Sequence, residues 1–124
     1  MVIGIEHAAI ASPDTEKLAK WYVETLGFVI NFNSGKTFFV KAPNGSMIEI
    51  IASETGLAPK AMKDAGLRHL ALTVGDYDAA FAELKAKGVS FLGEPIVNAD
   101  VKVAFFTDIE GNFLHIIQRL KPLG

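Results

Sequence analysis

The chain has 124 residues, of which 50% are hydrophobic and 21% charged. This composition is typical of one globular domain with a filled core. Twelve Lys and Arg residues against fourteen Asp and Glu residues give a formal charge of −2, so there is no basic excess for binding nucleic acid or an anionic membrane surface. The absence of cysteine excludes disulfides, thiolate catalysis and Cys-based metal sites. Any metal must therefore be bound through nitrogen and oxygen.

The chain shows no sign of a targeting or membrane segment. No apolar run approaches the roughly 20 residues that a membrane helix needs. The first residues contain no basic region followed by an apolar stretch, which argues against a secretory signal. We therefore expect a cytoplasmic protein.

The first half of the chain predicts a strand, a helix and three further strands. Residues 2–10 form the first expected strand. Ser12 and Pro13 signal a helix start, with Ser12 as the expected cap, and Gly27 signals its end. Apolar residues recur at helical spacing in between, namely Leu18, Trp21, Tyr22 and Leu26. The three strands then fall at residues 28–33, 37–41 and 47–52, separated by turn residues.

The second half repeats this order after a connecting segment, residues 54–66, in which 59–64 is the expected position of a short helix. A strand at 68–74 is followed by a helix that Asp76 caps and Gly88 ends. Strands are expected at 89–92, 102–107 and 113–119.

Two pairs of similar segments indicate an internal duplication. Residues 5–10 resemble 67–72, with His7 and His69 lying 62 positions apart. Residues 39–51 resemble 105–117 at an offset of 66. The chain is therefore interpreted as two βαβββ modules, about 1–53 and 67–121, joined by a linker at 54–66.

The only three histidines of the chain fall at positions that the repeat makes equivalent. His7 and His69 lie on the first strand of each half, and His115 lies on the last strand of the second half, where the first half has Glu49. Each has apolar neighbours, and a carboxylate such as Glu49 in Met-Ile-Glu-Ile-Ile needs a cation. This pattern predicts a divalent metal bound by all four side chains.

Other interpretations are open for each residue taken alone. A single histidine in a strand is more often a hydrogen-bonded core or surface residue than a ligand. Glu49 could pair with Arg68, Lys102 or Arg119 instead of a metal.

These residues and their order resemble the vicinal oxygen chelate superfamily. The similarity covers nearly the whole chain and rests on Leu26-Gly27-Phe28 at the end of the first helix, on Asn44-Gly45 before Ile48-Glu49, and on the second-half pattern Phe-x-x-Asp-x-x-Gly-Asn-x-x-ligand that ends at His115. The superfamily includes glyoxalase I (lactoylglutathione lyase), methylmalonyl-CoA epimerase, extradiol dioxygenases, and the fosfomycin and bleomycin resistance proteins.

The resemblance implies an α+β fold in which the two βαβββ modules form a curved, incompletely closed, eight-stranded mixed sheet around a metal. It also implies that His7, Glu49, His69 and His115 are the ligands of one divalent ion. Three imidazoles and one carboxylate suit Zn²⁺, Ni²⁺, Co²⁺, Mn²⁺ or Fe²⁺. Family members of this length commonly form homodimers, and the mean hydropathy of +0.30 is consistent with one.

Three functions follow as hypotheses. The first is a glyoxalase I-like lyase or isomerase that acts on a small oxygenated substrate through a metal-stabilised enediolate, with Glu49 as ligand and catalytic base. Glyoxalase I usually has Glu where this chain has His115, so the reaction is expected to differ. The second is a ring-cleaving dioxygenase-like enzyme dependent on Fe(II), and the third is a resistance protein that binds a drug or metabolite without turnover.

Overall fold

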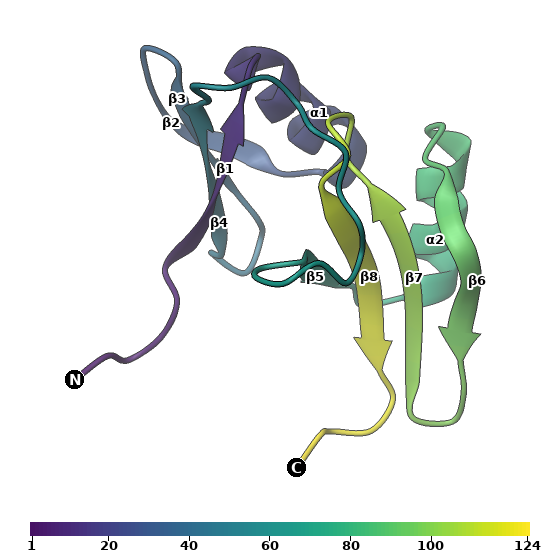
Figure 1. Cartoon of the computed structure of the whole chain (residues 1–124). Helices are drawn as coiled ribbons and strands as arrows, with labels where there is room; N and C mark the ends of the chain where they lie inside the picture. The colour runs from purple at the N-terminus through teal and green to yellow at the C-terminus, as the bar shows by residue number, and fades with distance from the viewer. The chain divides into compact units, whose positions relative to one another are not determined.

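The computed structural model describes residues 1–124 and divides into two compact units, Met1–Ala58 (unit 1) and Pro59–Gly124 (unit 2). Each unit has the predicted βαβββ order (Figure 1). The elements of unit 1 are β1 (His7–Ser12), α1 (Thr15–Leu26), β2 (Val29–Ser34), β3 (Thr37–Lys41) and β4 (Met47–Ala52). Those of unit 2 are β5 (His69–Thr73), α2 (Tyr77–Ala86), β6 (Phe91–Val97), β7 (Val101–Thr107) and β8 (Phe113–Arg119). Neither helix is long and apolar enough to cross a membrane.

The two units have the same mixed sheet topology. In unit 1 the strand order is β1-β4-β3-β2, with β1 parallel to β4 and the other pairs antiparallel. In unit 2 the order is β5-β8-β7-β6, with the parallel pair again formed by the first and last strands. The strand pairings therefore produce two four-stranded sheets where the superfamily resemblance implies a single eight-stranded sheet.

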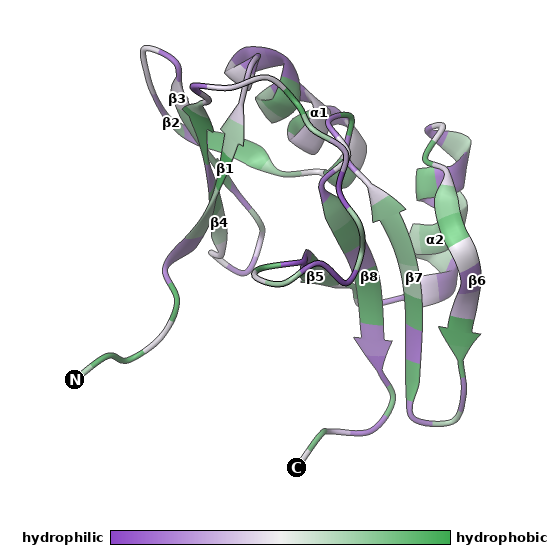
Figure 2. Ribbon diagram, in the orientation of Figure 1, coloured by the Kyte–Doolittle hydropathy of each residue, from purple (hydrophilic) through white to green (hydrophobic).

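One face of each sheet is covered by the helix of the same unit. Helix α1 packs on β3 and β4, and α2 packs on β7 and β8 (Figure 1). In Figure 2 strand β8 is hydrophobic over most of its length and changes to hydrophilic at its end. Because side chains alternate along a strand, the residues next to Glu49 and His115 in sequence point to the helix side. Ile48, Ile50, Leu114 and Ile116 are all buried there, which leaves the opposite face for the predicted ligands.

The predicted helix ends are confirmed with one correction. Gly27 is the C-cap of α1 at φ 78°, and Gly88 follows the C-cap of α2 at φ 88°. Asp76 caps α2 as predicted. The cap of α1, however, is Asp14, whose carboxylate accepts from the Lys17 amide, while the Ser12 hydroxyl accepts from the Asp14 amide. Ser12 therefore shapes the turn that precedes the cap.

Two predicted strands differ from the structure by several residues, and one predicted helix is absent. The strand expected at 2–10 begins only at His7, because its partner β4 begins at the facing Met47 and leaves residues 1–6 without a neighbour. The prediction of a helix at 59–64 is wrong, because this segment contains only a turn closed by Asp64. So short a helix does not offset the free-energy cost of its own nucleation. Strand β6 continues beyond residue 92 through Pro95, which an edge strand with an irregular register tolerates.

The turn between β7 and β8 sets the start of the strand that carries His115. Asp108 is buried there, and its carboxylate accepts hydrogen bonds from the backbone amides of Glu110 and Asn112 and from the Asn112 side chain. We expect Asp108→Ala to lower the free energy of unfolding by about 2 kcal/mol, because part-buried donors lose a charged acceptor. Urea unfolding measures this change. Asp108→Asn keeps one acceptor oxygen and should cost about half as much; equal stability of both variants and the wild type would contradict this role of Asp108.

Candidate metal centre

In unit 1 the structure brings His7 and Glu49 together. The two residues lie on the adjacent parallel strands β1 and β4, where Glu49 faces Ala9, so His7 is its diagonal neighbour. The His7 Nε2 and Glu49 Oε1 atoms are 3.5 Å apart. Both side chains are partly exposed, at 33% and 24%, so the pair is accessible from the sheet face that α1 does not cover.

A second carboxylate orients the His7 ring. The Nδ1 atom of His7 lies 2.8 Å from Oε1 of Glu6. A proton on Nδ1 donated to that carboxylate leaves the Nε2 lone pair directed toward Glu49. This arrangement, in which a carboxylate holds the far nitrogen of a histidine, is the usual support of a metal-binding imidazole. Glu6 was not predicted from the sequence, where it falls inside the strand expected at 2–10 and would point away from His7.

In unit 2 the structure brings His69 and His115 together by the same geometry. His115 faces Ala71 across the parallel pair of β5 and β8, which makes His69 its diagonal neighbour. The two ring centroids are 4.7 Å apart. The residue before His69 is Arg68, which donates to the Ala61 carbonyl, so no carboxylate corresponds to Glu6 in this unit.

His115 is a buried base without a hydrogen-bond partner. It is 7% exposed, and neither Nδ1 nor Nε2 has a partner. Burial lowers the pKa of His115 to about 4, with smaller contributions from His69 and Arg119. The ring is therefore neutral at pH 7 and keeps a free lone pair, which is the form that binds a metal.

A phenylalanine at the repeat-equivalent position packs against each pair. Phe39 faces Glu49 on β3, and its ring meets the His7 ring edge to face with centroids 5.3 Å apart. Phe105 faces His115 on β7 and lies edge to face with both His69 and His115, at 5.2 and 4.7 Å. Each pair therefore has one aromatic neighbour from the adjacent strand.

Each pair has the geometry expected of two of the four ligands of one metal ion. Two donor atoms bound to one ion at about 2.1 Å are themselves roughly 3–3.5 Å apart, and the His7 and Glu49 atoms have this separation. The two unpartnered nitrogens of His115 include the free lone pair that a metal ligand requires. Within either unit, however, no three His, Asp or Glu side chains gather as a metal-binding group, so neither pair is a complete site by itself.

Two of the three cationic side chains that could pair with Glu49 in place of a metal have other partners. Lys102 forms an ion pair with Asp78 at 3.3 Å, and Arg68 is held by the Ala61 carbonyl. Arg119 forms no ion pair. The ion pair recorded for Glu49 is the one with His7.

The burial of His115 predicts a pH dependence of stability in the metal-free protein. The pKa is about 4 in the folded chain and near 6.5 when unfolded. Below pH 6.5 the unfolded chain binds a proton that the folded chain does not, so stability falls as the pH drops from about 6.5 to 4. The total loss should reach up to about 3 kcal/mol.

Urea unfolding of chelator-treated protein at pH 7.5, 5.5 and 4.5 measures this loss. The variant His115→Gln removes the titrating group and should show a correspondingly flatter pH profile. Parallel profiles for the variant and the wild type would show that His115 is not the group responsible.

Comparison with known proteins identifies the family. A model of the Glyoxalase/Bleomycin resistance protein/Dioxygenase superfamily matches residues 4–116. The chain therefore belongs to this superfamily, as the sequence motifs indicate, and all four candidate ligands lie within the matched range.

Three similar proteins illustrate the range of the superfamily. Protein YwkD of Bacillus subtilis (strain 168), described as uncharacterized, is 39% identical over 103 residues, which cover 75% of this chain and 77% of that protein. The crystal structure of a glyoxalase family protein from Enterococcus faecalis has a TM-score of 0.76 at 27% identity and covers 93% of this chain and 97% of its own. TnmS3, an antibiotic binding protein from Streptomyces sp. CB03234, has a TM-score of 0.75 at 26% identity, covering 95% and 97%.

Proposed function

We propose that the chain is a divalent-metal-dependent enzyme of the glyoxalase I-like type, a lyase or isomerase acting on a small oxygenated substrate. In this proposal His7, Glu49, His69 and His115 together bind one ion, and the two βαβββ modules work as a single domain because each supplies half of the ligands. The curved arrangement of both sheets around the ion belongs to the same proposal.

The observation that carries the proposal is His115. A buried imidazole with two unpartnered nitrogens is costly and has no evident structural use where it lies. A bound cation would use one of those nitrogens directly. The same repeat-equivalent position in unit 1 holds Glu49 with an oriented histidine beside it.

The chemistry follows from the residue types. A divalent ion bound here would act as a Lewis acid toward a substrate oxygen. Glu49 is the only carboxylate among the four and is the candidate base for removing a proton from the carbon next to that oxygen. Phe39 and Phe105 pack edge to face against the histidine rings of the two pairs and so provide an apolar side to the site.

Metal analysis of protein purified without chelator tests the proposal. We expect one ion per chain by mass spectrometry of the metals, and activity screening with Zn²⁺, Ni²⁺, Co²⁺, Mn²⁺ and Fe²⁺ then identifies the functional one. The variants His7→Ala and His115→Ala, one in each unit, should both release the same single ion. Retention of metal by either variant at wild-type affinity would show that the two pairs do not share a site.

Similarity to TnmS3 supports a second candidate, a protein that binds a drug or metabolite without turnover. The same metal analysis separates the two, because a chain that holds no ion and accelerates no reaction while binding a ligand would fit only this second function. The dioxygenase-like alternative requires Fe(II) and oxygen consumption, which an oxygen electrode measures.

We also expect the protein to form a homodimer. Strand β2 is an edge strand, and Val29, Ile30 and Phe32 on it are exposed at 60%, 47% and 54%. An apolar edge of this kind is commonly covered by another chain. Light scattering at micromolar concentration should give twice the 13.4 kDa of one chain. The variant Phe32→Lys should shift the mass toward the monomer, and a monomeric wild type would contradict the expectation.

A further inference from the structure

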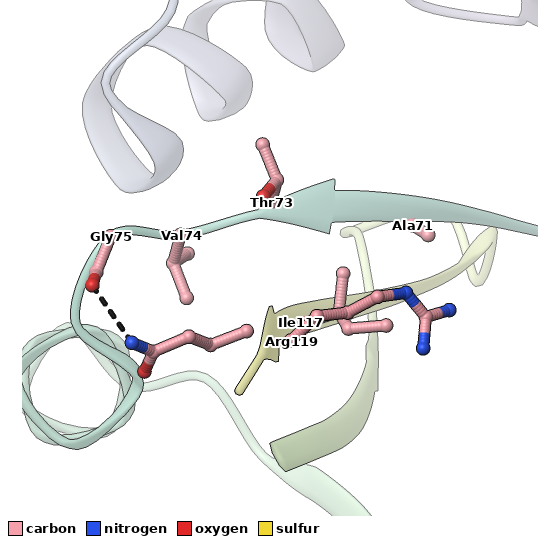
Figure 3. A pocket seen from close by; sticks show the side chains of 7 residues that line it. Ala71, Thr73, Val74, Gly75, Ile117 and Arg119 are labelled. Atoms are coloured by element: carbon pink, nitrogen blue, oxygen red, sulfur yellow. Dashed lines mark hydrogen bonds between the residues drawn. The ribbon is translucent and has the colours of Figure 1, made fainter. Parts of the chain in front are cut away.

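An open pocket of about 570 Å³ lies in unit 2 where β5 and β8 end. Figure 3 shows its lining, which comes from the end of β5, the following Val74 and Gly75, and the end of β8. A pocket of this volume suits a small organic molecule. The polar groups that line the pocket determine which kind of molecule it binds.

Two of the three polar side chains in the pocket are free to bind a ligand. Gln118 is occupied, since its amide donates to the Gly75 carbonyl and its oxygen accepts from the Tyr77 amide. Arg119 and Thr73 have no side-chain hydrogen bond or ion pair in the structure. No acidic residue lines the pocket, so its net charge is positive.

Arg119 lies on the same sheet face as the predicted metal ligands. His115, Ile117 and Arg119 are every second residue of β8, so their side chains lie on one face of the sheet. Thr73 of β5 faces Ile117. In Figure 3 the Arg119 guanidinium extends along the sheet toward Ala71, which is the residue that faces His115. A molecule held by Arg119 can therefore lie beside the His69 and His115 pair.

We propose that Arg119, assisted by the Thr73 hydroxyl, binds a carboxylate of the substrate, which makes the substrate a small oxygenated carboxylic acid with an apolar part. A guanidinium matches a carboxylate through two parallel hydrogen bonds. The pocket offers one cation, which balances a singly charged carboxylate better than a doubly charged phosphate. Ala71, Val74 and Ile117 provide the apolar contacts.

The identification of this acid as substrate rests on the proposed function, whereas its binding at Arg119 does not. The experiment is therefore a binding measurement on chelator-treated protein, with ligand-detected NMR as the readout. Mandelate serves as the probe because it combines a carboxylate, a neighbouring hydroxyl and an apolar ring. Mandelamide is its uncharged counterpart, and phenyl phosphate is the doubly charged comparison.

Mandelate should bind at least about tenfold more tightly than mandelamide, and Arg119→Gln should weaken mandelate binding by about tenfold or more. Arg119→Lys should give an intermediate affinity, because it keeps the charge and loses the two-point geometry. Thr73→Val should have a smaller effect in the same direction. Lys121→Gln is the matched control: it removes one positive charge two residues away, on an exposed side chain paired with Asp100.

Equal mandelate affinity in the wild type and Arg119→Gln, absence of mandelate binding, or tighter Arg119-dependent binding of phenyl phosphate would each overturn the proposal. Arg119 is exposed, so Arg119→Gln should fold normally, and its thermal unfolding verifies this. A wild type that binds mandelate through Arg119 but holds no metal would instead overturn the proposed function and leave this binding site established.

Discussion

The substitution Glu49→Gln is expected to weaken metal binding by at least about a hundredfold. Glu49 is the only anion among the four proposed ligands, and loss of even an outer carboxylate commonly costs ten- to a hundredfold in metal affinity. Competition with a coloured chelator measures the change. The side chain keeps its size, so the packing of β4 should be preserved.

Two controls give this experiment its meaning. Glu94→Gln neutralises an exposed carboxylate on β6 and should leave metal affinity unchanged. If Glu49 is also the base, then Glu49→Gln should remain inactive when metal is restored at saturating concentration. Recovery of activity under saturation would limit Glu49 to metal binding, and wild-type metal affinity in the variant would remove it from the site.

The substitution His115→Glu is expected to create or strongly raise isomerisation of the methylglyoxal–glutathione adduct. The superfamily resemblance places Glu at this position in glyoxalase I, where it serves as base, and a positioned general base contributes typically a hundredfold or more. Formation of the thioester product, followed by its ultraviolet absorbance, measures the gain. The assay requires added metal, because a carboxylate at this buried position is costly without a cation.

His69→Glu is the matched control, since it introduces the same charge at the neighbouring ligand and should not produce the activity. A wild type that already catalyses this isomerisation well, with no change in His115→Glu, would show that His115 is compatible with ordinary glyoxalase I chemistry. The natural substrate would then be sought among thiol adducts.

Much of the fold could be predicted because its signals are local. Gly27 and Gly88 end the helices at positive φ, and the strands with clear turns on both sides, at 37–41, 47–52 and 113–119, have the predicted bounds. The errors concern properties that depend on a distant partner. Residues 2–6 have strand-forming composition but no strand beside them. The single eight-stranded sheet was expected from family resemblance, which does not specify backbone pairing.

The candidate site could be predicted only as far as the repeat makes residues equivalent. The repeat matches His7 with His69 and Glu49 with His115. The pairs that lie together, His7 with Glu49 and His69 with His115, follow instead from the parallel pairing of the first and last strands of each unit. Glu6 was missed because neighbouring residues in a strand point to opposite faces, and its bond to His7 is possible only since residue 6 precedes β1. The pocket at Arg119 was missed because it forms where strands end and depends on Gln118 holding the start of α2.

The two diagonal pairs bear on the ancestry of the chain. If a single module once paired with an identical copy, the shared ligand set would have been symmetric, with either two histidines and two carboxylates or four histidines. The first set favours harder ions such as Mn²⁺, and the second favours Cu²⁺, Ni²⁺ or Zn²⁺. If the chain arose by fusion of two such copies, each could then change alone, and the difference between Glu49 and His115 would be one such change. Under this hypothesis, either Glu49→His or His115→Glu would restore a symmetric ligand set with the corresponding metal preference.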